Sequence, residues 1–307
     1  MTILKRVLTA SLIAAALVAW QPGAGQQPAW ARGPSKEFSR SLATAEQLYG
    51  RGAFHEAVGF YQQASTMEPE NFQARLGLGR SLARVGEDAR ALKELFSAML
   101  LNPSRPRELV PARVDIAAIL MKQGNYDEAG GQLKQLLDID PSDLAVRGNL
   151  GICLEQIGYL DAAIEQFKYV IRAAPDSVPA LYNLGNAFLT RGDFELAGAC
   201  FEKITRVDPS NALALVGMAR TALGQSKLEL ASRIASKAVA MDSRNHLAYL
   251  TLAESYDKLG VRGKAIENYK KAIQLNPKDP ASQAALARLL ESSRKVAGAG
   301  MTLKTTR

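Results

Sequence analysis

Cysteine and histidine are scarce in this sequence, whose 307 residues contain only two of each. Cys153 and Cys200 are too few for a disulfide framework. We interpret them as small packing residues, although an oxidising compartment would also permit a disulfide between them. Both lie far in the sequence from His55 and His246, so the spacing of a zinc site is missing. The sequence therefore predicts neither a metal centre nor a cofactor.

Aromatic residues are also few, at 7% of the chain, whereas hydrophobic residues reach 47% and charged residues 22%. This balance favours a helix-rich globular protein over a disordered one. The net charge is +8, but no basic stripe interleaved with aromatics runs along the body. We therefore expect no nucleic-acid partner. The last twenty residues are basic, and their charged residues are Arg288, Glu291, Arg294, Lys295, Lys304 and Arg307. This basic end of the chain is either a solvated end or a weak contact for anionic lipid.

The first 31 residues have the three-part layout of a secretory signal. Lys5 and Arg6 precede the uncharged run 7–20, which is shorter than the ~20 residues that span a bilayer. Ala29 and Ala31 stand where a signal peptidase reads small residues. We expect an exported protein, periplasmic or associated with the cell envelope, followed by a short linker at 32–37. The alternative is an uncleaved N-terminal membrane anchor.

An internal repeat organises the rest of the chain. Prolines recur at 69, 103, 141, 175, 209 and 277, and Ser243 fills the one gap. The steps between these positions are 34 residues, except for the step from 103 to 141, which is 38 residues. An alanine keeps the same phase at 57, 91, 129, 163, 197, 231 and 265. We predict seven units at 38–71, 72–109 with an insertion, 110–143, 144–177, 178–211, 212–245 and 246–279, then a capping helix at 280–295 and a flexible basic tail at 296–307.

Each repeated residue has a physical role in a pair of antiparallel helices. A small residue in the first helix, such as Gly185, lets the second helix approach closely, and we expect it to oppose the in-phase alanine. A glycine, such as Gly192, ends the first helix, and proline ends the second. No pair can bury its apolar face alone, so stacked neighbours share one core. The predicted fold class is all-α, an α-solenoid of helix-turn-helix units.

The unit 178–211 resembles the tetratricopeptide-repeat (TPR) family. Its Leu184-Gly185 pair, followed by Phe188, Ala197, Phe201 and Pro209, is similar to the family pattern of Leu-Gly, an aromatic, Ala, an aromatic and Pro. The resemblance covers 38–279 and implies a right-handed superhelix with an extended peptide along the first helices. Two departures stand out. Ser104 to Pro111 forms an insertion, and the unit 212–245 replaces large residues with Ala222 and Ala235, which predicts early amide exchange there.

No catalytic constellation is complete in the sequence, so we predict that the protein is not an enzyme. His55-Glu56 begins like a zinc-protease helix, but Gly59 stands where the second histidine is needed. Gly260, Gly263 and Lys264 are spaced too closely for a phosphate loop.

Five residues on the first helices are the candidate peptide-binding site: Asn149, Tyr182, Asn183, Asn186 and Arg220. Asn149 and Asn183 hold the same position in adjacent units, and this resembles the asparagine ladder with which some TPR superhelices grip a peptide backbone. Asparagine is also simply common at this position in the family. Tyr182 is the expected exposed anchor.

The resulting hypothesis is a non-catalytic scaffold or adaptor of the cell envelope that binds a protein or peptide segment in its concave groove. One alternative is a structural subunit of a stable envelope complex, packed through its convex face or its ends. Another is a small enzyme or ligand-binding protein, which would need a polar pocket that the repeat does not predict.

Overall fold

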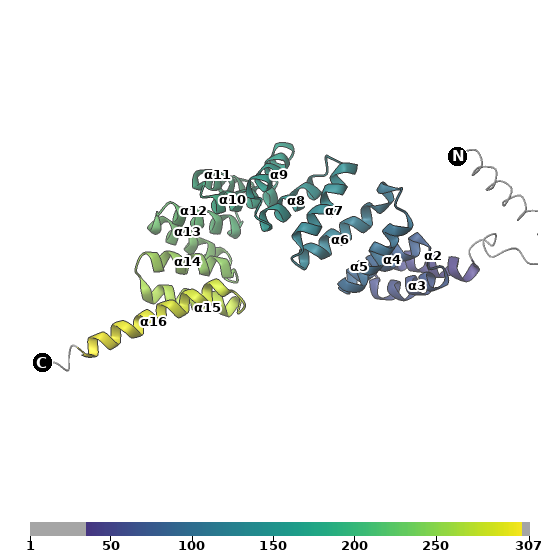
Figure 1. Cartoon of the computed structure of the whole chain (residues 1–307). Helices are drawn as coiled ribbons and strands as arrows, with labels where there is room; N and C mark the ends of the chain where they lie inside the picture. Colours follow the sequence, from purple (N-terminus) through teal and green to yellow (C-terminus); the bar gives the residue numbers. More distant parts are fainter. Residues whose placement is uncertain (1–34, 303–307) are drawn as a thin grey trace, which may run out of the picture. The chain divides into compact units, whose positions relative to one another are not determined.

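The computed structural model describes residues 35–302, and their side chains as far as Glu291 (Figure 1). The predicted secretory signal at 1–31, residues 32–34 of the predicted linker and residues 303–307 of the predicted tail lie outside the described residues. The chain divides into an N-terminal part, which ends at Ala112, and a C-terminal part, which begins at Arg113.

Every regular element of the described residues is helical. The N-terminal part contains α2 (Lys36–Gly50), α3 (Phe54–Met67), α4 (Phe72–Val85), α5 (Asp88–Leu101) and the 3₁₀ turn η2 (Pro106–Leu109). Helix α6 (Val110–Lys122) crosses into the C-terminal part, which continues with α7 (Tyr126–Ile139), α8 (Leu144–Gln156), α9 (Leu160–Ala173), α10 (Val178–Arg191), α11 (Phe194–Val207), α12 (Ala212–Gly224), α13 (Leu228–Met241), α14 (His246–Lys258), α15 (Arg262–Leu275) and α16 (Pro280–Thr302). The predicted all-α solenoid of helix-turn-helix repeats is confirmed.

A side-chain cap two residues after the in-phase proline starts several first helices. The Asn71 side chain accepts a hydrogen bond from the Ala74 N–H at 3.1 Å. Asp143 does the same for Val146 at 2.9 Å. Such caps satisfy backbone donors that the first helical turn leaves without partners. Proline therefore ends one helix and the cap begins the next within three residues.

The turn between the two helices of a repeat needs a left-handed backbone. Gly86 has a φ of +85°, which glycine adopts without a Cβ clash. Ser226, which replaces the in-phase glycine in the unit 212–245, keeps a φ of +60°. A non-glycine residue costs roughly 1–2 kcal/mol there, so this unit retains the turn geometry at the expense of stability.

Large side chains of the second helices fit against the small residues of the first. The ring of Phe201 is fully buried, and a Cβ on Gly185 would lie 2.7 Å from it. Likewise, a Cβ on Gly151 would lie 2.5 Å from Phe167. The atoms nearest to these glycines thus belong to the large residue one helical turn after the in-phase alanine.

A repeated polar contact also ties first helices to second helices. Arg75 pairs with Glu94 at 2.8 Å, from α4 to α5. Arg147 donates to the Gln166 side chain at 3.0 Å, from α8 to α9, and its guanidinium lies 3.7 Å from the centre of the Tyr169 ring. Both contacts join residues nineteen apart. The repeat thus preserves a polar bridge on the half-buried side of the helix pair.

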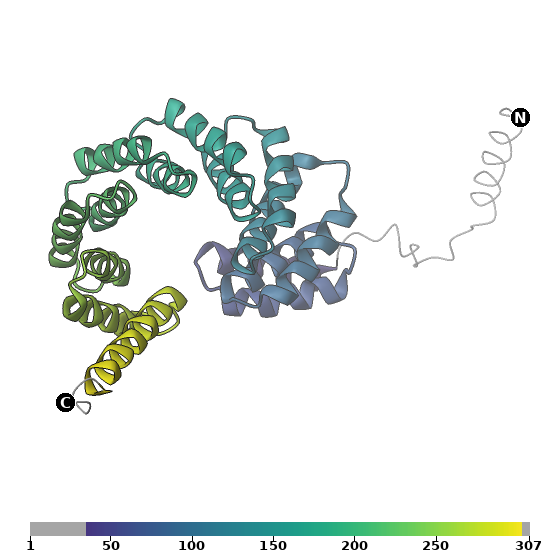
Figure 2. The ribbon, with the colours of Figure 1, turned by 60° about the vertical axis from the view of Figure 1, so that its left-hand side comes forward.

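The helix pairs of the C-terminal part follow one another along an arc (Figure 2). Successive first helices contact each other, α8 with α10, α10 with α12 and α12 with α14. Close approach of the first helices places them on the inner side of this arc, with the second helices outside.

Helix α16 packs on α15 and continues to Thr302, beyond the predicted end of the capping helix at Lys295. Leu289 is buried, and Arg262 donates to its carbonyl oxygen at 2.7 Å. Leu290, the next residue, is 40% exposed. The run from Val296 to Met301 contains no proline, so nothing in it must end the helix. Within residues 35–302, no helix is both long and apolar enough to cross a bilayer.

Candidate peptide-binding surface

The five predicted site residues all lie on first helices of the C-terminal part. Asn149 is an exposed residue of α8, and Arg220 is an exposed residue of α12. Tyr182, Asn183 and Asn186 are half-buried residues of α10. All five therefore lie on helices at the inner side of the arc.

The structure joins two of the five directly. The Arg220 Nη1 donates a hydrogen bond to the Asn186 Oδ1 at 3.2 Å, across the contact between α10 and α12. The two residues are 34 positions apart and so occupy the same place in successive repeats. No hydrogen bond links Asn149 to Asn183 among the described residues. The structure therefore links Asn186 and Arg220 directly, and the asparagine ladder at Asn149 and Asn183 stays a prediction.

Tyr182 contacts the core of the repeats and is also partly exposed. Its ring meets the ring of Phe201 edge to face, with centroids 6.0 Å apart and planes at 70°. This contact attaches Tyr182 to the core shared by α9, α10 and α11. The sequence predicted an exposed anchor, whereas Tyr182 is half-buried. A ring held in this way offers contact area at a small entropic cost.

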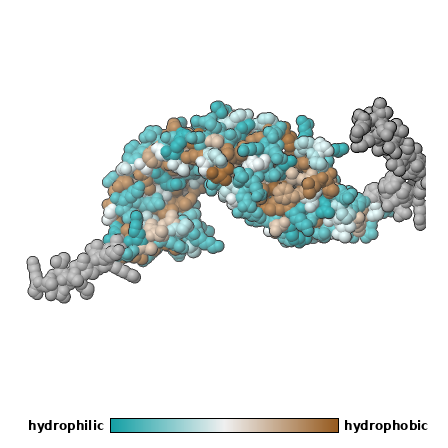
Figure 3. Space-filling model, viewed as in Figure 1, coloured by the Kyte–Doolittle hydropathy of each residue, from teal (hydrophilic) through white to brown (hydrophobic). Residues whose placement is uncertain are grey.

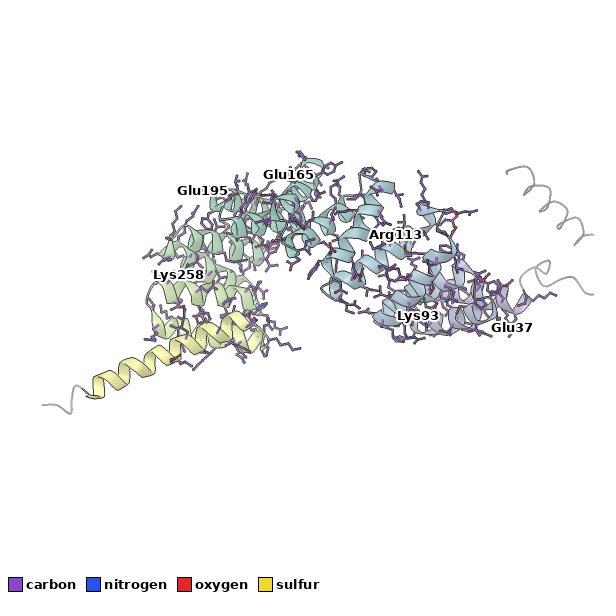
Figure 4. All side chains as sticks on the ribbon, viewed as in Figure 1. Glu37, Lys93, Arg113, Glu165, Glu195 and Lys258 are labelled. Carbon is purple, nitrogen blue, oxygen red and sulfur yellow. The ribbon has the colours of Figure 1, made fainter. Side chains whose placement is uncertain are left out.

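A pocket of about 790 Å³ lies beside Arg220, in the last repeats of the C-terminal part. Helices α12, α14, α15 and α16 build it, and Lys258, labelled in Figure 4, stands on its wall. Its lining residues are Arg220, Leu223, Gly224, Glu254, Asp257, Lys258, Tyr269, Ala284, Ala285 and Arg288. Arg220 and Glu254 again hold the same place in successive repeats, so the row Asn186, Arg220 and Glu254 leads into the pocket.

The lining of the pocket contains charged groups of both signs, and some of them are partly buried. Burial raises the pKa of the Glu254 carboxyl, and the positive charges of Arg220 and Lys258 oppose that rise. Asp257 forms an ion pair with Arg288 of α16. Burial, with the charges of Glu254 and Asp257, also raises the pKa of the Tyr269 hydroxyl. The pocket therefore offers a partly buried carboxylate, Glu254, with cationic groups beside it, whereas the Tyr269 side chain is almost fully buried.

Sequence reasoning found only part of this pocket. Of its lining residues, only Arg220 was among the five predicted site residues. Asp257, Lys258, Tyr269 and Arg288 were missed. Tyr269 belongs to the second helix α15, outside the first helices on which the site was sought, and Arg288 comes from α16, whose packing the repeat does not specify.

The described residues offer no cluster of three or more histidine, cysteine, aspartate or glutamate side chains that would hold a metal ion. Cys153 and Cys200 are both buried free thiols. Burial raises the pKa of Cys200 to about 11 and raises that of Cys153 as well. A thiol that stays protonated at neutral pH is a poor nucleophile.

Comparisons with known proteins agree with the repeat. Models described as "Tetratricopeptide repeat" match residues 42–107 and 182–246, residues 120–184, and residues 246–279. A human protein, "Tetratricopeptide repeat protein 6", is 30% identical over 117 residues, which are 37% of this chain and 22% of that protein's length. The chain thus spans about a fifth of this relative.

Two solved structures share the fold. A tetratricopeptide repeat protein from Parabacteroides merdae is 16% identical, with a TM-score of 0.69 over 83% of this chain and 100% of that one. MamA from Desulfovibrio magneticus is 20% identical, with a TM-score of 0.53 over 58% of this chain and 99% of that one.

Proposed function

The chain belongs to the tetratricopeptide-repeat family, whose members generally act as non-catalytic scaffolds for protein–protein interaction, and from this premise we propose a specific role. The protein is a scaffold or adaptor of the cell envelope, and a segment of a partner protein binds along the inner face of its C-terminal part. It has no catalytic activity of its own.

The observation that carries the proposal is the polar row formed by Asn186, Arg220 and Glu254. Its residues repeat with the period of the array, two of them are hydrogen-bonded, and the row ends in a pocket of about 790 Å³. Amide and guanidinium groups can bind the backbone of an extended segment without reading its sequence. Side chains of that segment can then enter the pocket, where charged groups of both signs are available.

The location rests on the first 31 residues of the sequence. A basic start, an uncharged run and Ala29-Trp30-Ala31 support export, and the cell envelope follows as the compartment. Cell fractionation of the full chain and of a variant lacking residues 2–31 tests this. We expect the full chain in the periplasmic or envelope fraction and the truncated chain in the cytoplasm. Cytoplasmic recovery of both would contradict the location.

Mild crosslinking in intact envelopes tests the surface. The variant combines Tyr182→Ala, Asn183→Ala and Asn186→Ala, and circular dichroism verifies that its helix content is unchanged. Glu165→Ala with Lys168→Ala is the matched control, because this exposed ion pair lies on the second helix α9. We expect wild type and control to capture the same partner and the triple variant to lose it.

Equal capture by all three proteins would refute binding through the inner face. A partner that co-purifies stably and ignores these substitutions would favour the alternative, a subunit of a permanent envelope complex joined through the convex face or the ends of the array.

A further inference from the structure

Helix α5 exposes two large apolar side chains at repeat positions where the other second helices carry polar or small residues. Phe96 is 40% exposed and Leu100 is 81% exposed. Phe96 lies five residues after the in-phase Ala91, and Leu100 lies nine after it. The residues equivalent to Phe96 are Gln62, Lys134, Lys168, Glu202, Ser236 and Lys270, and those equivalent to Leu100 are Thr66, Asp138, Arg172, Arg206, Ala240 and Gln274. The repeat itself therefore provides the comparison, and solenoid packing does not require apolar residues at these positions.

The two side chains form part of a wider surface, which we name the α5 face and define by Lys93, Phe96, Leu100, Leu101 and Arg107. Lys93, Phe96 and Leu100 are three and four residues apart and so lie on one side of the helix. Leu101 is also exposed, and Arg107 belongs to the exposed η2 turn in the insertion that follows α5. Figure 3 shows hydrophobic surface over the region where Figure 1 draws α4 and α5, and Figure 4 labels Lys93.

The carboxylates that border the α5 face are already paired. Glu87 pairs with Arg90 at 2.6 Å, Glu94 with Arg75 at 2.8 Å, and Glu108 with Arg105 at 2.8 Å. Lys93 and Arg107 form no ion pair within the part of the chain that the structure describes. The α5 face therefore combines exposed apolar side chains with two cations that have no acidic partner among the described residues.

We propose that the α5 face is a docking surface for an acidic amphipathic helix of another protein, separate from the inner-face site. Phe96 and Leu100, one turn apart, form the kind of ridge that packs into the groove of a second helix. Acidic residues on the partner would neutralise Lys93 and Arg107. A second copy of this chain fits less well, because a symmetric contact would bring these cations together. Exposed apolar side chains that no neighbour covers mark such interaction sites.

Two synthetic peptides of roughly eighteen residues, about five helical turns, are the probes. Both carry leucines along one helical face; one has glutamate and the other has lysine at the remaining positions. Fluorescence anisotropy measures the binding of each labelled peptide to the full chain. We expect the glutamate peptide to bind at least about tenfold more tightly than the lysine peptide, since tenfold corresponds to ~1.4 kcal/mol.

Two variants connect this binding to the α5 face. Phe96→Gln with Leu100→Thr installs the residues that the first repeat carries at these positions, Gln62 and Thr66, so the fold should be retained. It should weaken the binding of the glutamate peptide by about tenfold or more, because the two apolar side chains that the peptide would bury are removed. Lys93→Glu with Arg107→Glu should reverse the preference in favour of the lysine peptide.

Equal binding of both peptides, or binding that neither variant changes, would overturn the proposal. Binding of the wild type to anionic phospholipid vesicles that is lost with Phe96→Gln and Leu100→Thr would assign the α5 face to a membrane surface instead. Self-association lost in the same variant, measured by analytical ultracentrifugation, would assign it to a second copy of the chain. Either result would overturn the helix proposal, and neither bears on the inner-face site.

Discussion

The fit of Phe201 between two first helices makes Gly217→Ala a sensitive test of how the repeats pack. The ring is fully buried between α10 and α12. A Cβ on Gly217 would lie 2.4 Å from two of its ring atoms. On the opposite side, a Cβ on Gly185 would lie 2.7 Å from the same ring. The ring therefore has no free space into which it could retreat.

The expected magnitude follows from two opposing effects. Replacing glycine with alanine inside a helix stabilises by ~1 kcal/mol. Overpacking a filled core costs about 1–3 kcal/mol. Gly148→Ala is the matched control, because Gly148 lies inside helix α8 and a Cβ there would meet nothing within 4 Å. The helix-propensity gain is common to both variants, so Gly217→Ala should be less stable than Gly148→Ala by about 1–3 kcal/mol.

Urea unfolding followed by far-UV circular dichroism measures this difference, and hydrogen exchange locates it in α10 to α12. Adding Phe201→Leu to Gly217→Ala should reduce the penalty of the alanine, because the shorter side chain leaves room for the new methyl group. If Gly217→Ala proved as stable as Gly148→Ala, the close fit of Phe201 would not limit the packing of these repeats, and the reasoning would fail.

Burial raises the pKa of Glu254, so its charged form weakens the native state as pH rises through that pKa; Glu254→Gln should raise the urea midpoint at about pH 7 and have little effect at about pH 4. An equal gain at both pH values would contradict this. Because the pKa of Cys200 is raised to about 11, its thiol should react with iodoacetamide far more slowly in the native protein than in urea, and equal rates would argue against burial. The unit 212–245 should exchange its amides first, since a pocket of about 340 Å³ lies beside Ala222, whereas uniform protection would show that its core is as well packed as the others.

Periodic residues in the sequence determined the repeats. In-phase proline, alanine and glycine indicated two helices per unit, because each of these residues has a local role that depends little on distant contacts. The same period predicted that Asn149, Tyr182, Asn183, Asn186 and Arg220 share one face of the first helices. Helix α16 was predicted to begin at about Pro280, and it begins there.

Only the tertiary structure decided which of these residues act together. The bond between Arg220 and Asn186 depends on how α10 packs against α12, and the pocket requires Tyr269 from a second helix and Arg288 from α16. The half-burial of Tyr182 follows from its contact with Phe201. Period specifies the side of a helix to which a residue belongs, whereas packing between helices sets the distances, the burial and the pKa values on which binding depends.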